Sequence, residues 1–319
     1  MKITLDLSKL VEEGRLSPAE AEKLKALAAQ ETGSLGINIL IGFGVVAVAA
    51  GALALVPTPL TAMLLGIVLT ACGAAIVLKR VENWALFGQI CLVVGALTFC
   101  GGVIAYGDGS LASMLIVTAA LALMAIAARS SLLTALAVLA ASACLGARAG
   151  YSHAAYSLAI FEPTLTIVLF SALALAAYRL SKHLPADYER IALMASRTSV
   201  VLINFGFWVG SLWGDPLVLL RGMNDKTPAA RLNEIAIPDT VFGIGWALAL
   251  LAAGAWAVRV NRRWLVNVAA VFGGIHFYTQ WFERLGATPF SILLGGVVML
   301  AAALTLWRFN QRAMAVAVK

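Results

Sequence analysis

Charged side chains are scarce in this sequence. Aspartate, glutamate, lysine and arginine make up 12% of the 319 residues, whereas 61% of the residues are hydrophobic. A water-soluble domain carries about twice that charged fraction, so the composition argues against a soluble globular protein. The apolar residues are gathered in runs of about 20, the length that crosses the hydrocarbon core of a bilayer. The sequence therefore predicts an all-α, polytopic transmembrane helix bundle.

Sequence signatures of catalysis and of metal binding are also missing. No H-E-x-x-H, G-x-S-x-G or phosphate-binding P-loop occurs. The four cysteines fall within apolar runs and form no C-x-x-C pair, which indicates small buried hydrophobic residues. We expect no cofactor and no metal. The net charge of +7 lies mainly in short connections, as in proteins that face an anionic leaflet, so the expected partner is the lipid bilayer and not nucleic acid.

Ten spans can be read along the chain. They lie near 36–56, 60–78, 84–106, 111–127, 131–147, 156–178, 196–214, 239–258, 264–282 and 288–307. With the N-terminus in the cytoplasm, 18 of the 23 lysines and arginines fall on the inner side and 5 on the outer side, as the positive-inside rule requires. Both termini are therefore predicted to be cytoplasmic. Residues 111–147 fit either two short spans or a re-entrant pair.

Two segments are predicted to lie outside the transmembrane bundle of residues 34–310. Residues 1–33 form a cytoplasmic helical hairpin, whose second helix starts at a capping box of Ser17 and Glu20 with Pro18 in its first position. So small a hairpin needs a surface to dock on, which is the bundle, a second copy of the chain or a cytoplasmic partner. Residues 215–238 form an extracytoplasmic loop with a short amphipathic helix near 228–236, and Asp239 caps the next span.

Small residues at helix-packing spacing predict close contacts between spans. Gly245, Ala249 and Ala253 form one such series, and Ala47 and Gly51 form another. Small side chains allow backbones to approach in lipid. These positions describe packing and carry no chemistry.

Polar residues within the spans are the candidate functional residues, because they are costly in hydrocarbon. Glu162 is the first of them. If its span begins near Tyr156, the carboxyl lies about 9 Å below the outer end of the helix. Pro163 cannot donate to the carbonyl of Ala159, so a kink and a free acceptor are expected there. A buried carboxyl suits proton or cation handling, although a structural glutamate held by an arginine or across helices would show the same pattern.

A second candidate is a stripe on the ninth span. His276, Gln280 and Glu283 are spaced i, i+4, i+7 and share one helix face, either as a binding site or as a hydrated helix end. Asn204, near the middle of the seventh span, either hydrogen-bonds across helices or joins the same intramembrane polar pathway. On the outer side, Asp108, Arg148, Asp215 and Arg284 could form an extracytoplasmic vestibule; nothing in the sequence shows that they converge.

Three stretches resemble the bacterial predicted membrane proteins grouped as domain of unknown function 2157. They are the N-terminal "LSKLVEEGRLSPAEAEKLKAL" with "LGINILIGFGVVAVAAGALAL" after it, the span "LVVGALTFCGGVIAYGDGS", and the closing "YTQWFERLGATPFSILLGGVVMLAAALTLWRFNQR". At residues 105–108 the sequence departs from the family, which often has a Gln-aromatic-His segment. The resemblance covers about the first 130 and the last 40 residues. It implies this architecture and a bacterial inner membrane, and no reaction.

Three functions follow as hypotheses. The first is a transporter or permease-like bundle, proton-coupled through Glu162; ten spans would divide into halves of opposite orientation, although the halves show no sequence similarity. The second is a membrane-embedded sensor or scaffold that binds a partner through residues 1–33. The third is an enzyme acting on a lipid-linked substrate at the outer leaflet, with Glu162, His276 or Glu283 as acid or base.

Overall fold

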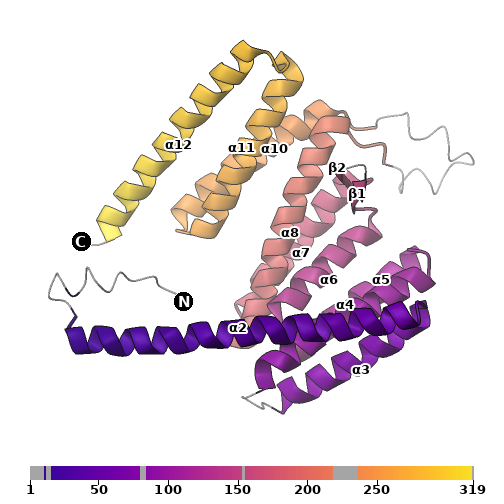
Figure 1. The fold of residues 1–319 in the computed structure, drawn as a ribbon. Coiled ribbons are helices and arrows are strands. Elements are labelled where there is room, and N and C mark those ends of the chain that lie inside the picture. The colour runs from indigo at the N-terminus through magenta and orange to yellow at the C-terminus, as the bar shows by residue number, and fades with distance from the viewer. Residues whose placement is uncertain (1–10, 12–15, 80–83, 153–154, 218–235, 318–319) are drawn as a thin grey trace, which may run out of the picture. The chain divides into compact units, whose positions relative to one another are not determined.

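The computed structural model describes residues 11, 16–79, 84–152, 155–217 and 236–317 (Figure 1). The chain divides into two compact units, Met1–Leu133 and Thr134–Lys319. The first unit contains α2 (Pro18–Leu55), α3 (Pro59–Leu78), α4 (Ala85–Tyr106) and α5 (Leu111–Ala128). The boundary between the units lies within α6 (Ser131–Cys144).

The second unit continues with a β-hairpin and five helices. These elements are β1 (Arg148–Ser152), β2 (Ala155–Ala159), α7 (Pro163–Ser181), α8 (Ala186–Trp213), α10 (Asp239–Arg259), α11 (Arg263–Leu285) and α12 (Pro289–Ala317). The two strands are antiparallel, with Arg148 opposite Ala159 and Ser152 opposite Ala155. Among the described residues, six helices are long and apolar enough to cross a membrane: α3, α4, α5, α7, α8 and α10. Their length and composition are those of a membrane protein.

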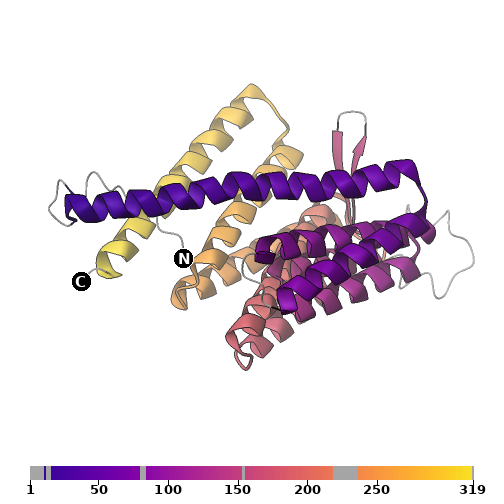
Figure 2. The same cartoon turned by 60° about the horizontal axis from the view of Figure 1, so that its bottom comes forward.

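The first helix is longer than the sequence suggested. The capping box is confirmed, because the Ser17 amide donates to Glu20 Oε2 at 3.0 Å and the Glu20 amide donates to Ser17 Oγ at 3.3 Å. From Pro18 the helix runs without a break to Leu55, as Figure 2 shows. The second arm of the expected hairpin and the first apolar run are therefore one element, with no break near residue 33. The first arm of that hairpin lies almost wholly outside the described residues.

The ends of three other segments also differ from expectation. The run at 156–178 is not a single helix, because Ala155–Ala159 pairs with β1 and α7 begins only at Pro163. Asp239 is the first residue of α10 and not its N-cap residue, because Pro238 occupies the N-cap position. The amphipathic helix expected near 228–236 falls on residues outside the described part, apart from Ala236. Of the pair at 111–147, α5 reaches spanning length, whereas α6 has 14 residues.

Helices α3 and α4 pack through glycines that recur every seven residues. Gly66 and Gly73 lie on α3, and Gly88, Gly95 and Gly102 lie on α4. A Cβ added at Gly73 would lie 2.5 Å from the carbonyl oxygen of Gly88, and one added at Gly95 would lie 2.5 Å from the backbone nitrogen of Thr70. The two backbones are thus in direct contact, which only glycine permits. Small residues serve this purpose between helices in lipid.

The two glycines in the small-residue series expected from the sequence, Gly51 and Gly245, do not lie at close contacts. A Cβ at Gly51 would have nothing within 4 Å, and one at Gly245 would make only an ordinary contact, 3.6 Å from the ring of Phe207. In the second unit, close approaches between helices occur at Gly206, against Ile167 and the carbonyl of Pro163, and at Gly210, against the ring of Phe242. These two glycines place α8 against α7 and α10.

Candidate functional site

A buried hydrogen bond joins α8 to α10. The indole Nε1 of Trp246 donates to Asn204 Oδ1 at 2.9 Å, and Trp246 is completely buried. The Asn204 amide nitrogen donates to the carbonyl of Val200, one turn earlier on α8, at 2.8 Å. Both ends of this amide therefore have partners, as a buried polar group requires. The bond fixes Trp246 against α8.

Helix α11 completes the site from the other side of Trp246. The His276 ring packs edge-on against the Trp246 indole, with centroids 4.9 Å apart and planes at 74°. Phe272, one turn earlier on α11, packs edge-on against Phe205, with centroids 5.7 Å apart, and lies tilted against Trp246, with centroids 6.5 Å apart. The Trp246 indole thus contacts the imidazole directly, and Phe272 and Phe205 extend this aromatic cluster between α8, α10 and α11.

Gln280 lies one turn beyond His276 and faces a glycine. A Cβ at Gly243 would lie 3.2 Å from Gln280 Oε1, so the missing side chain of Gly243 makes room for the amide. The neighbouring Thr279 accepts a hydrogen bond from Trp208 Nε1 at 3.1 Å, which fixes this turn of α11 against α8. We call Asn204, Trp246, His276 and Gln280 the α8–α10–α11 polar cluster.

Two nitrogen atoms of this cluster lack a partner. Nδ1 of His276 and Nε2 of Gln280 are buried, and neither has a hydrogen-bond partner among the described residues. A buried donor or acceptor without a partner costs about 1–3 kcal/mol. Such groups are uncommon in folded proteins and call for a specific explanation. The two residues are four apart on one helix, so both nitrogens can serve a single small polar group.

Searches of protein-family models, of curated proteins and of solved structures return no significant match to this chain. The site is therefore interpreted from its own geometry.

A second polar site lies at the start of α7. Asp215, which follows the C-terminus of α8, is completely buried. Its Oδ2 accepts a hydrogen bond from the Thr164 amide and its Oδ1 one from the Leu217 amide, both at 2.8 Å. A carboxylate at the N-terminus of a helix satisfies an amide and interacts favourably with the helix dipole. Asp215 also bridges to Ile237 through backbone hydrogen bonds. We interpret this carboxylate as a cap for α7 supplied by the neighbouring helix.

The interpretation of Glu162 as a residue inside a helix is wrong. Glu162 is the N-cap residue of α7 and Pro163 is the first helical residue, a position where the missing amide hydrogen of proline breaks no helical bond. The kink expected at Pro163 and the helical carbonyl expected to be free at Ala159 are therefore absent, because Ala159 is the last residue of β2 and not part of a helix. The side chain of Glu162 is nonetheless 2% exposed, so a buried carboxyl remains at the start of α7.

The other candidate residues lie elsewhere. Glu283, third in the stripe of α11, is exposed. Asp108 is exposed in the turn between α4 and α5, at a φ of 47°, and belongs to the first unit. For Arg148 and Arg284 the structure describes only the backbone, in β1 and α11. Of the nine candidates, the structure thus gathers Asn204, His276 and Gln280 at one site, and places Glu162 and Asp215 at another.

Sequence reasoning missed two members of the site. Trp246 and Gly243 sit in an apolar run rich in glycine and alanine, where a tryptophan and a glycine are both common. Their spacing of three residues, which puts them on one face of α10, is the one local signal. This spacing indicates a shared site only once α11 is known to pack against that face of α10.

Proposed function

We propose that this protein is a multi-pass inner-membrane protein that binds a small polar solute at the α8–α10–α11 polar cluster and carries it across the membrane, as a permease does. We further propose ten spans, cytoplasmic termini and membership of the family of domain of unknown function 2157. Support for the family comes from the three sequence stretches that resemble it. Support for the site comes from its contacts.

The topology proposal starts from the six spanning-length helices. Three shorter apolar helices add to them: Leu40–Leu55, Ser131–Cys144 and Pro289–Ala301. Helix α11 is 23 residues long, enough to cross about 30 Å of hydrocarbon at 1.5 Å per residue, and its polar residues are what lower its hydropathy. Counting these four helices gives ten spans, and an even number puts both termini on one side.

The observation that carries the functional proposal is the pair of buried nitrogens on α11. In hydrocarbon no water satisfies a polar side chain, so a buried group needs a protein partner or a ligand. Asn204 has found its partners in Trp246 and Val200, whereas His276 Nδ1 and Gln280 Nε2 have none among the described residues. Nε2 of an amide is a donor, so the solute must offer an acceptor oxygen there. Small polar solutes with a carbonyl, hydroxyl or carboxylate oxygen fit this requirement.

Proton coupling is the second part of the proposal and is assigned to Glu162. Its carboxyl is buried at the start of α7, and burial favours the neutral form of a carboxyl. In proteoliposomes containing a pH-sensitive dye, Glu162→Gln is expected to abolish solute-driven proton uptake. Unchanged uptake in that variant would remove Glu162 from the mechanism.

The solute site is tested by a comparison of stability and ligand response. Purified protein is unfolded by titration with sodium dodecyl sulfate, alone and with amino acids, sugars or small carboxylates. Gln280→Met is expected to stabilise the ligand-free protein by about 1 kcal/mol, because it replaces an unsatisfied buried amide with an apolar chain of similar length. The same variant should lose the stabilisation that a solute gives to the wild type.

Glu283→Gln is the matched control, since Glu283 lies one turn further along α11 and is exposed. It should respond to solutes as the wild type does. If Gln280→Met destabilised the protein, the amide would have a structural role. If no solute stabilised the wild type, Gln280→Met or Glu283→Gln, the proposal would be contradicted.

One observation favours the sensor or scaffold alternative. In α2, residues 18–39 precede the apolar part that begins at Leu40, and a continuous helix extends about 33 Å over this stretch. A helix of that length offers a partner a preformed surface. Deletion of residues 1–30 discriminates between the functions: loss of a co-purifying partner with solute flux intact supports the scaffold, and loss of flux alone supports the transporter.

A further inference from the structure

The end of the second unit where α7 ends and α8 begins is strongly basic. Residues 178–197 contain four lysines and arginines, and residues 259–264, at the turn from α10 to α11, contain three; the same stretches hold two carboxylates. All seven basic side chains are exposed. The two stretches meet, because Arg262 Nη2 donates to the Tyr178 hydroxyl at 3.5 Å. Positive charge is therefore concentrated at one end of this unit.

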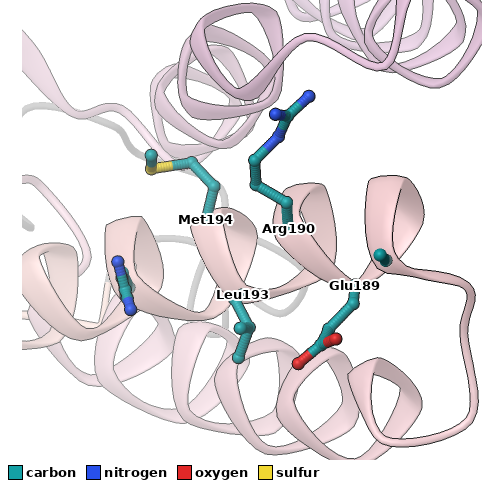
Figure 3. Close-up of a pocket in the computed structure, with 6 residues that line it drawn as sticks. Glu189, Arg190, Leu193 and Met194 are labelled. Carbon is teal, nitrogen blue, oxygen red and sulfur yellow. The ribbon is translucent and has the colours of Figure 1, made fainter. Parts of the chain in front are cut away.

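A cavity of about 210 Å³ lies in this region, beside the first half of α8. Its lining residues are Ala186, Glu189, Arg190, Leu193, Met194 and Arg197. In Figure 3, Arg190 and Met194 point to one side of the helix and Glu189 and Leu193 to the other. Along the helix, Ala186 is followed in the lining by the charged Glu189 and Arg190, then by the apolar Leu193 and Met194, and last by Arg197. Basic and apolar side chains thus lie next to one another in the lining, which suits an amphiphilic ligand.

Arg197 is held in place by an aromatic ring. Its guanidinium lies over the indole of Trp264, 5.4 Å from the ring centroid, a favourable cation–π geometry. Tryptophan favours the level of the lipid headgroups, and Trp264 is the second residue of α11. Lys182 is placed in the same way over Tyr178, 5.0 Å from its centroid. The cationic groups are thus pre-positioned beside rings that prefer the membrane interface.

The length of α8 puts the cavity at headgroup depth. The helix has 28 residues and is about 42 Å long, some 12 Å more than the hydrocarbon core. Its first turns therefore reach beyond the hydrocarbon if the helix spans the membrane.

We propose that this cavity binds the headgroup of one anionic phospholipid. The lipid phosphate accepts hydrogen bonds from Arg190 and Arg197, since guanidinium groups pair well with phosphate, and the glycerol lies beside Met194, which points to the same side of α8 as Arg190. The volume accommodates a phosphate and its glycerol rather than a folded partner. The inference requires the membrane location but does not depend on the solute site.

The test measures lipid binding to the full-length protein in detergent by native mass spectrometry. Phosphatidylglycerol and phosphatidylcholine with identical acyl chains are titrated separately. We expect one phosphatidylglycerol to bind about tenfold more tightly than phosphatidylcholine, and the double variant Arg190→Gln, Arg197→Gln to remove this preference. Trp264→Leu should weaken it by about threefold, because Arg197 loses its support.

The control is a double variant with the same loss of charge at exposed positions elsewhere, Lys79→Gln with Arg308→Gln. It should keep the preference, and so should His276→Phe, which affects only the solute site. Equal binding of the two lipids by the wild type, or equal losses in the two double variants, would overturn the proposal. Displacement of the lipid by millimolar inorganic phosphate would also overturn it, in favour of a soluble phosphate ligand.

Discussion

The glycine contact between α3 and α4 allows a sharp test of the fold of the first unit. Gly95 and Gly101 both lie on α4, yet a Cβ at Gly95 would lie 2.5 Å from the backbone nitrogen of Thr70, whereas one at Gly101 would have nothing within 4 Å. Replacing glycine by alanine in a helix contributes about 0.5–1 kcal/mol of stability through backbone entropy. Both alanine variants gain that amount, so the difference between them isolates the contact.

The cost at Gly95 follows from the distance. A carbon atom needs about 3.4 Å from a backbone nitrogen, so the helices must separate locally by about 0.9 Å, which corresponds to overpacking of a core at about 1–3 kcal/mol. The contact is made by backbone, which cannot rotate away as a side chain can. We therefore expect Gly95→Ala to be destabilised by about 1–2 kcal/mol and Gly101→Ala to be stabilised by up to about 1 kcal/mol.

The assay is equilibrium unfolding in mixed micelles of dodecyl maltoside and sodium dodecyl sulfate, followed by far-ultraviolet circular dichroism. The comparison uses the midpoint and slope of each variant. If Gly95→Ala were as stable as Gly101→Ala, the two backbones would not be in contact, and the seven-residue glycine pattern would have no packing role.

Three further predictions concern hydrogen bonds. Asp215→Ala removes a buried acceptor of two amides and should cost about 3 kcal/mol in the same unfolding assay; an effect below about 1 kcal/mol would refute its capping role. Trp246→Phe leaves Asn204 Oδ1 without its donor and should cost about 1–3 kcal/mol, while adding Asn204→Leu should recover part of the loss; no recovery would refute the coupling. The hydrogen bonds from Ser17 lower the pKa of Glu20. Their stabilisation of the helix start is therefore fully present above the usual glutamate pKa and is lost as the pH falls through the lowered pKa. Amide hydrogen exchange of the first turn of α2 should show this loss in the wild type and not in Ser17→Ala.

Local signals were predicted well from the sequence. The start of α2 is set by residues within one turn, Ser17 to Glu20, and the structure has the hydrogen bonds that this pattern predicts. The stripe on α11 was also placed correctly for His276 and Gln280, since helical periodicity decides which side chains share a face. Glu283 follows the same periodicity and is exposed, because it lies near the end of the helix.

Signals that depend on distant partners could not be predicted. The residues Ala155–Ala159 are apolar enough to continue a span, and they form a strand only because β1 pairs with them; this error shifted Glu162 into a helix. The seven-residue spacing of the glycines is visible in the sequence, but it indicates a helix contact only when α3 and α4 are known to pack side by side. Nothing in the vicinity of Asp215 reveals that its target is the first turn of α7.

The unbroken length of α2 has a mechanical consequence. A helix of 38 residues is a rod of about 57 Å, and its backbone hydrogen bonds leave no joint at which one half could turn without the other. A torque applied to the polar half by a bound molecule would therefore be delivered to the apolar half with little loss. Two adjacent glycines inserted near residue 34 would make the helix flexible there. A rotation of residues 18–39 would then no longer be transmitted to Leu40–Leu55.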